Sequence, residues 1–60
     1  MTFGQKLKAS REKAGLTMIA TAKLIGIPGG TYEGWEYDRH APSAILQAFI
    51  LELISDATKK

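Results

Sequence analysis

The stretch GIPGGTYEGWE, residues 26–36, decides how this chain folds. A proline with glycines on both sides marks a tight connection. Tyr32 and Trp35 then recur three residues apart, which places them on one face of a helix. The stretch therefore predicts a turn followed by a short helix, over about Gly30–Tyr37, that buries its two aromatic side chains.

Two further helices are expected before this stretch. The first covers about Thr2–Lys13 and ends at Gly15, a plausible left-handed cap. The second starts after the capping residue Thr17 and stops at Gly26. Both helices have an amphipathic pattern. One stripe of the first helix carries Phe3, Leu7, Ser10 and Ala14. The apolar positions of the second helix are Ile19, Ala22 and Ile25.

One more helix is expected after the stretch. Asp38 should end the preceding helix, because aspartate tolerates the left-handed conformation. Pro42 and Ser43 are start signals for a final helix that runs to about Asp56. Thr58, Lys59 and Lys60 are expected to fray. No segment alternates apolar and polar residues as a strand does, so the sequence predicts one all-α domain of four helices over residues 1–60.

Length and composition narrow the functional classes. A 60-residue chain buries only about 60% of its unfolded surface, so its stability should be small. The absence of cysteine and the single histidine argue against disulfides and a metal site, and no cofactor is expected. No segment reaches the roughly 18–20 apolar residues of a membrane span, and none resembles a signal peptide. We therefore expect a cytoplasmic protein without a membrane partner.

Charge and motif content point away from catalysis. The net charge is +2 and the isoelectric point about 9.2, which permits a nucleic-acid partner without identifying one. The sequence has no Ser/His/Asp set, no phosphate loop and too small a body to shape a substrate pocket. We therefore expect a binding protein that is not an enzyme and has no small-molecule ligand.

The final helix is more apolar than a single buried stripe requires. At 100° per residue its large apolar side chains cover about half of the circumference. The excess predicts a homodimer interface, although exposed apolar residues are also common on monomers. The residues expected at this interface are Ile45, Phe49, Ile50, Leu53 and Ile54.

Four segments together resemble a known family. They are LKASREKAGLT from Leu7, AKLIGI from Ala22, TYEGWEYDRHAPS from Thr31 and LQAFILELI from Leu46. In order and spacing they are similar to the lambda-repressor-like, or Xre/Cro-type, helix-turn-helix DNA-binding domains. The ending APSAILQAFILELISD is also similar to the tail of the small anti-CRISPR-associated phage autorepressors. The resemblance implies a compact four-helix domain with a central helix-turn-helix.

The chain departs from the family pattern at several positions. Met18 replaces a glutamine that the family directs at the DNA backbone, and Thr21 replaces a core leucine. Asp38 replaces a glycine. Gly29 and Gly30 stand where the family usually carries side chains that read bases. These changes keep the fold and reduce the number of polar groups that can contact DNA.

The resemblance also implies roles for individual residues. Arg11 and Glu36 resemble a structural pair that links the first and third helices. Backbone N–H groups at the start of the third helix suit a phosphate, and Glu33 can accept a hydrogen bond from cytosine, unless it is only a solvated surface residue. The expected DNA-binding residues are Met18, Lys23, Gly29, Gly30, Thr31, Glu33, Gly34, Tyr37, Arg39 and His40.

Two functions remain open from the sequence. The first is a dimeric repressor that binds an inverted repeat in double-stranded DNA, most simply an autorepressor of a phage or mobile-element operon. The second is a helix-turn-helix-fold interaction module, such as an antitoxin or an inhibitor, with weak or lost DNA binding. Met18, Gly29 and Gly30 motivate the second function, because they remove polar readers and expose Met18 and Ile19.

Overall fold

A computed structural model describes residues 1–58 and shows four α-helices, which confirms the predicted all-α class. The helices are α1 (Phe3–Ala14), α2 (Met18–Ile25), α3 (Gly29–Glu36) and α4 (Ala44–Thr58). No strand occurs within the described residues. None of these helices combines the length and apolar character needed to cross a bilayer.

The predicted boundaries hold to within two residues. The third helix begins and ends one residue earlier than expected, and Tyr37 follows it as the capping residue. The fourth helix continues to Thr58, whose hydroxyl donates a hydrogen bond to the carbonyl of Ile54 at 3.0 Å. The expected fraying at Thr58 is therefore wrong, while Lys59 and Lys60 lie outside the described residues.

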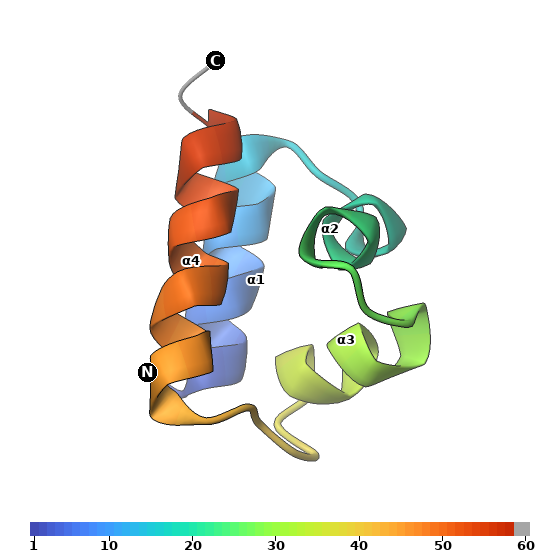
Figure 1. Ribbon diagram of the computed structural model, residues 1–60, viewed down its shortest axis with the longest axis vertical. Helices are drawn as coiled ribbons and strands as arrows, with labels where there is room; N and C mark the ends of the chain where they lie inside the picture. Colours follow the sequence, from blue (N-terminus) through green and yellow to red (C-terminus); the bar gives the residue numbers. More distant parts are fainter. Residues whose placement is uncertain (59–60) are drawn as a thin grey trace.

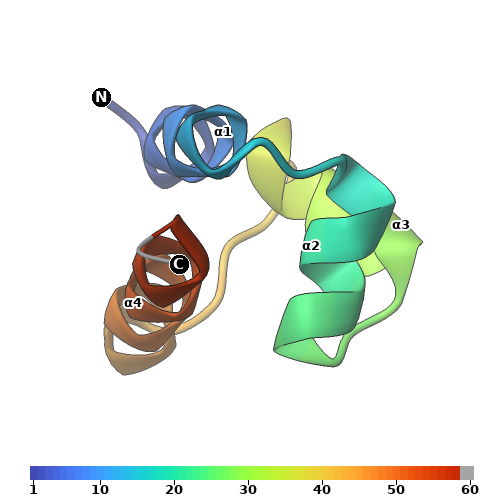
Figure 2. The same cartoon turned by 90° about the horizontal axis from the view of Figure 1, so that it is seen from above.

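The four helices form two pairs. α1 and α4 lie side by side and run in the same direction, while α2 and α3 form the other side of the molecule (Figures 1 and 2). α1 also contacts α3, and α2 also contacts α4. Only residues 26–28 separate α2 from α3, so the two short helices and their glycine-containing turn form one compact unit.

The helix caps follow the local sequence. The side chain of Thr17 accepts a hydrogen bond from the backbone N–H of Ala20 at 3.1 Å. Gly15 and Gly26 end α1 and α2 with φ angles of 71° and 90°, in the left-handed region that glycine adopts without strain. Thr2 and Gln5 add a capping box at the start of α1. The helix ends predicted at Gly15, Thr17 and Gly26 are thereby confirmed, whereas the capping box was not predicted.

The core lies between the two pairs of helices. Tyr32 and Trp35 are both buried, as the spacing of the opening stretch predicts. Thr21, where the family that the chain resembles carries a leucine, is fully buried, and its hydroxyl donates to the carbonyl of Thr17 at 2.8 Å. This bond satisfies the buried hydroxyl group. The remaining buried apolar residues are Leu7, Ala22, Ile50 and Ile54.

Fewer apolar residues of α4 are exposed than the predicted dimer interface requires. Ile50 and Ile54 were expected at a dimer interface, but both are fully buried within the single chain. This part of the prediction is wrong because the half-circumference apolar face of α4 includes the side that packs on α1 and α2. Leu53 is half-buried. Ile45 and Phe49 remain exposed, at 85% and 54%.

Asp38, the second residue after α3, forms hydrogen bonds with the start of α1. Asp38 adopts φ 59°, the left-handed conformation expected for it. Its carboxylate accepts hydrogen bonds from the Thr2 hydroxyl at 2.8 Å and from the Gly4 N–H at 3.1 Å. A carboxylate at a helix N-terminus satisfies free N–H groups and complements the helix dipole. Asp38 therefore caps α1 from 34 residues away, which the sequence did not reveal.

Gly4 permits the close approach of α1 to α3. A β-carbon at this position would lie 2.6 Å from the carbonyl oxygen of Glu36 and 2.7 Å from that of Trp35. Both are backbone atoms of a packed helix, so they cannot move independently. The position therefore requires glycine for packing, although its helical backbone conformation does not.

We predict that Gly4→Ala lowers the free energy of unfolding by about 1–3 kcal/mol, because the added methyl group overpacks the contact between α1 and α3. Urea titration followed by circular dichroism measures this change. Gly30→Ala is the matched control, because a β-carbon there meets no atom within 4 Å. It should leave stability unchanged or raise it by up to about 1 kcal/mol. Equal losses in both variants would contradict the packing explanation.

Candidate nucleic-acid interface

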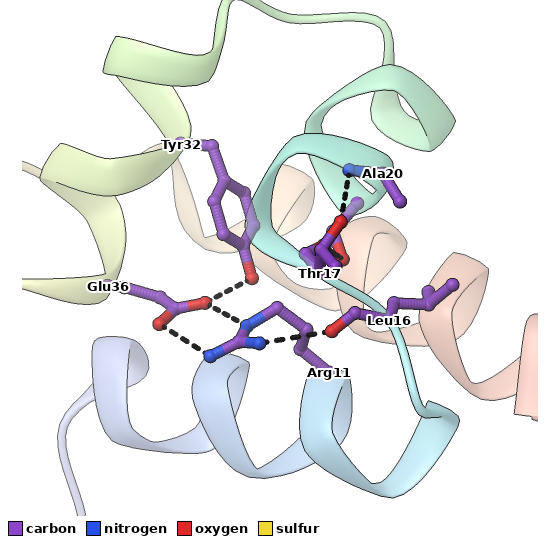
Figure 3. A network of polar contacts seen from close by, with 7 residues as sticks. Arg11, Leu16, Thr17, Ala20, Tyr32 and Glu36 are labelled. Atoms are coloured by element: carbon purple, nitrogen blue, oxygen red, sulfur yellow. Dashed lines mark hydrogen bonds and ion pairs between the residues drawn. The ribbon is translucent and has the colours of Figure 1, made fainter.

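A buried ionic network fixes the inner side of α3. Arg11 donates from Nε to Glu36 Oε2 at 2.7 Å and from Nη2 to Glu36 Oε1 at 3.4 Å (Figure 3). Its Nη1 donates to the carbonyl of Leu16 at 3.0 Å. The Tyr32 hydroxyl donates to Glu36 Oε2 at 2.6 Å. The side chain of Glu36 is only 3% exposed, so these donors replace the water that the carboxylate loses.

The network stabilises the packing of α3, and its groups keep the protonation states that their hydrogen bonds require. The hydrogen bond with Glu36 raises the pKa of Arg11, so the guanidinium stays charged. Burial and the hydrogen bond to Glu36 raise the pKa of Tyr32 well above its usual value, so its hydroxyl stays a donor. Arg11 and Glu36 form the pair that the family resemblance implies, and α3 is thereby held against α1 and the segment before α2.

The outer side of α3 is nearly free of side chains. Gly29, Gly30 and Glu33 are exposed, and Thr31 is half-buried. The residue before the helix is Pro28, and within the described part of the chain no side chain caps the helix N-terminus. The first N–H groups of a helix have no partner within it. The exposed surface at this end of α3 is therefore largely backbone with hydrogen-bond donors facing outward.

A hollow separates the start of α2 from this side of α3. It is lined by Thr17, Met18, Ile19, Gly29 and Glu33, and most of the lining is apolar. Met18 is half-buried and packs against the core, so the expectation that it is exposed is wrong. Ile19 is 67% exposed. The exposure expected for Ile19 is therefore confirmed, although Ile19 was also counted among the apolar positions of the amphipathic pattern of α2. With no side chain at Gly29, the hollow stays open.

Gly34 lies elsewhere than predicted. It was expected on the outer face, but it is buried, and the ring of His40 covers it. A β-carbon at Gly34 would collide with the His40 imidazole. Gly34 therefore cannot contact DNA directly in this conformation. His40 is exposed beside it, where its imidazole is accessible to a partner.

The remaining predicted contacts lie at the other ends of the two helices. Tyr37 is 60% exposed just after α3, and the Arg39 guanidinium lies over its ring, 5.5 Å from the centroid. This cation–π contact gives Arg39 a preferred direction. Lys23 is exposed on α2, four residues after Ile19 and therefore on the same stripe of the helix. None of these cations lines the hollow, whose ionisable residue is Glu33.

The structure brings some of the predicted DNA-binding residues together at the hollow and leaves the others outside its lining. Met18, Gly29 and Glu33 come together at the hollow. Thr17 and Ile19 also belong to it, although the sequence indicated only a cap for Thr17 and did not place Ile19 in a DNA-binding site. The sequence did contain a signal for Ile19, because Ile19 directly follows Met18, which departs from the pattern of the family that the chain resembles.

Comparison of the chain with protein-family models, with curated proteins and with solved structures gives no match.

The raised pKa of Tyr32 predicts a pH dependence of stability. A folded-state pKa above the unfolded value of 10.0 means that the folded protein binds the hydroxyl proton more tightly. The stabilisation is therefore complete below about pH 10 and is lost as the pH rises further. Tyr32→Phe should cost about 1.5–3 kcal/mol at pH 8, the value of a hydrogen bond to a charged group.

Urea titrations at pH 8–11 test this expectation. The difference in unfolding free energy between the wild type and Tyr32→Phe should shrink above pH 10. Tyr37→Phe is the matched control, because that side chain is exposed, and it should follow the wild type at every pH. A constant difference across the range would show that Tyr32 titrates alike in both states.

Proposed function

We propose that the protein is a DNA-binding transcriptional regulator that inserts the outer side of α3 into the major groove. The observation that carries this proposal is the uncapped, exposed N-terminus of α3 beside the start of α2. Free N–H groups and the helix dipole favour a phosphate there. The glycines Gly29 and Gly30 let the backbone approach closely, while the Arg11–Glu36 pair holds the helix rigid from its inner side.

The contacts divide into two kinds. Phosphate contacts position a protein on DNA, and base contacts specify the sequence. Arg39, Lys23 and His40 are the proposed phosphate contacts, together with the backbone of the first turn of α3. Thr31 and Glu33 are the proposed base readers, because a hydroxyl can bond a base edge or touch a thymine methyl and a carboxylate can accept from cytosine.

The proposed active species is a homodimer on an inverted repeat. Ile45 and Phe49 are exposed on one end of α4, together with Leu46, which is 40% exposed. Three large apolar side chains within five residues form a patch of the kind that marks interfaces. A two-fold dimer would present two α3 helices to half-sites about 10 base pairs apart. We propose repression by occupancy, in keeping with the resemblance to phage autorepressors.

One observation favours a second function, a protein-interaction module. The hollow is mostly apolar, its ionisable residue is acidic, and Ile19 projects beside it. Such a surface fits an apolar side chain of a partner protein as well as DNA. The two functions differ in their salt dependence, because only a phosphate-binding surface releases many counterions.

The DNA proposal predicts protection of a palindrome upstream of the gene that encodes this chain. Footprinting and fluorescence anisotropy at two salt concentrations measure it, and affinity should fall steeply as salt rises. Arg39→Ala should weaken all sequences alike and reduce the salt slope by about one. Lys8→Ala is the control, because Lys8 is an exposed cation on α1 that is not among the proposed DNA contacts. Absence of any preference over random duplex at low salt would favour the interaction module.

The dimer proposal is tested separately by sedimentation. The wild type should sediment as a dimer at tens of micromolar, and Phe49→Ser should shift it toward the monomer because the substitution removes an exposed apolar anchor. Leu24→Ser provides a control at a comparably exposed apolar residue on α2. A monomeric wild type at this concentration would contradict the proposal, and so would a shift of equal size in the control.

A further inference from the structure

The hollow between α2 and α3 combines apolar side chains with one carboxylate. Met18 and Ile19 supply an apolar wall, and Glu33 supplies a carboxylate. Within residues 1–58 the only ion pair is Arg11–Glu36, so Glu33 has no cation to neutralise it. An ionised carboxylate is an acceptor only. A ligand that suits the hollow must therefore present an apolar group next to a hydrogen-bond donor.

The start of α3 keeps the hollow open. A β-carbon added to Gly29 would meet no atom within 4 Å, so no side chain of residues 1–58 occupies that space. The hollow has a volume of about 420 Å³. This volume falls within the roughly 300–1,000 Å³ of small-molecule sites, so the hollow can admit the edge of a base and not only a methyl group.

The negative charge of Glu33 determines which group of DNA the hollow can accept. Inside the hollow, a phosphate oxygen carries no donor and would be repelled by Glu33, so the phosphate proposed at the start of α3 must lie outside the hollow. In the major groove, the C5-methyl group of thymine is the apolar feature, and the N4 amino group of cytosine is a donor that glutamate accepts from. Resting on the proposed DNA binding, we infer that the hollow receives a pyrimidine C5-methyl group while Glu33 accepts a hydrogen bond from an adjacent cytosine amine.

Two sources can supply this chemistry. One is a thymine next to a cytosine, in which two bases share the two features. The other is a single 5-methylcytosine, which carries the methyl group and the amine on one edge. In either case the protein recognises a methyl group in the major groove. The apolar side chains of Met18 and Ile19 make this contact in place of polar base-reading side chains.

The experiment compares DNA that differs only in methyl groups. Two random duplex pools, one with cytosine and one with 5-methylcytosine, are enriched on the 60-residue chain at low salt. The enriched duplexes are then resynthesised with deoxyuridine in place of thymidine, which removes the thymine methyl group. Dissociation constants are measured by fluorescence anisotropy.

The two sources give different results. If thymine supplies the methyl group, deoxyuridine lowers affinity about fourfold for each methyl group lost, the value expected for one buried carbon. If 5-methylcytosine supplies it, the methylated pool binds tighter by about the same factor and deoxyuridine has no effect. Equal affinity for all of these duplexes would overturn the inference and leave DNA binding intact. Failure to enrich any duplex would overturn the proposed function as well.

Two variants connect the effect to the hollow. Ile19→Ala should reduce the methyl dependence, whereas Leu24→Ala should keep it, because Leu24 lies on the same helix but does not line the hollow. Glu33→Gln should shift the enriched neighbouring base from cytosine to adenine, which glutamine reads through two hydrogen bonds. Ile19 and Glu33 are exposed, so both variants should keep the wild-type melting curve. An unchanged methyl dependence in a folded Ile19→Ala variant would overturn the assignment to this hollow.

Discussion

The buried carboxylate of Glu36 is the constraint on which the rest of the structure depends. A charge that is only 3% exposed must be matched by donors, or it would destabilise the fold. Arg11 supplies most of them from α1, and Tyr32 supplies another from α3 itself. Because Arg11 also donates to the carbonyl of Leu16, its guanidinium connects α1, α3 and the segment before α2. α3 therefore has a defined orientation in a protein with a very small core.

The glycines of this chain serve opposite purposes. Gly4 brings α1 against the carbonyl oxygens at the end of α3, and Gly34 makes room for the ring of His40. Gly29 and Gly30 have open space around them and leave the start of α3 without side chains. The first two glycines thus tighten the interior, and the last two expose the backbone on the surface that we propose as the DNA-binding face. Under this proposal, the selectivity for DNA sequence comes from few side chains and from apolar contact.

Local features were predictable because they depend on neighbours in the sequence. The four helices, the caps at Thr17, Gly15 and Gly26, and the inward spacing of Tyr32 and Trp35 follow from patterns a few residues long. The site was predictable only in part. Met18 and Gly29 were recognised as departures from a family pattern, but their meeting with Ile19 and Glu33 in one hollow depends on how α2 packs beside α3.

The sequence by itself determined the helices, their ends and the absence of any disulfide-forming residue, since these follow from local conformational preference and composition. Only the tertiary structure decided which apolar residues of α4 are covered, because a face that spans half of a helix does not specify its partner. It also decided that Asp38 caps a helix 34 residues away and that Gly34 lies under His40. These contacts join distant segments, and their geometry exists only after the helices have packed.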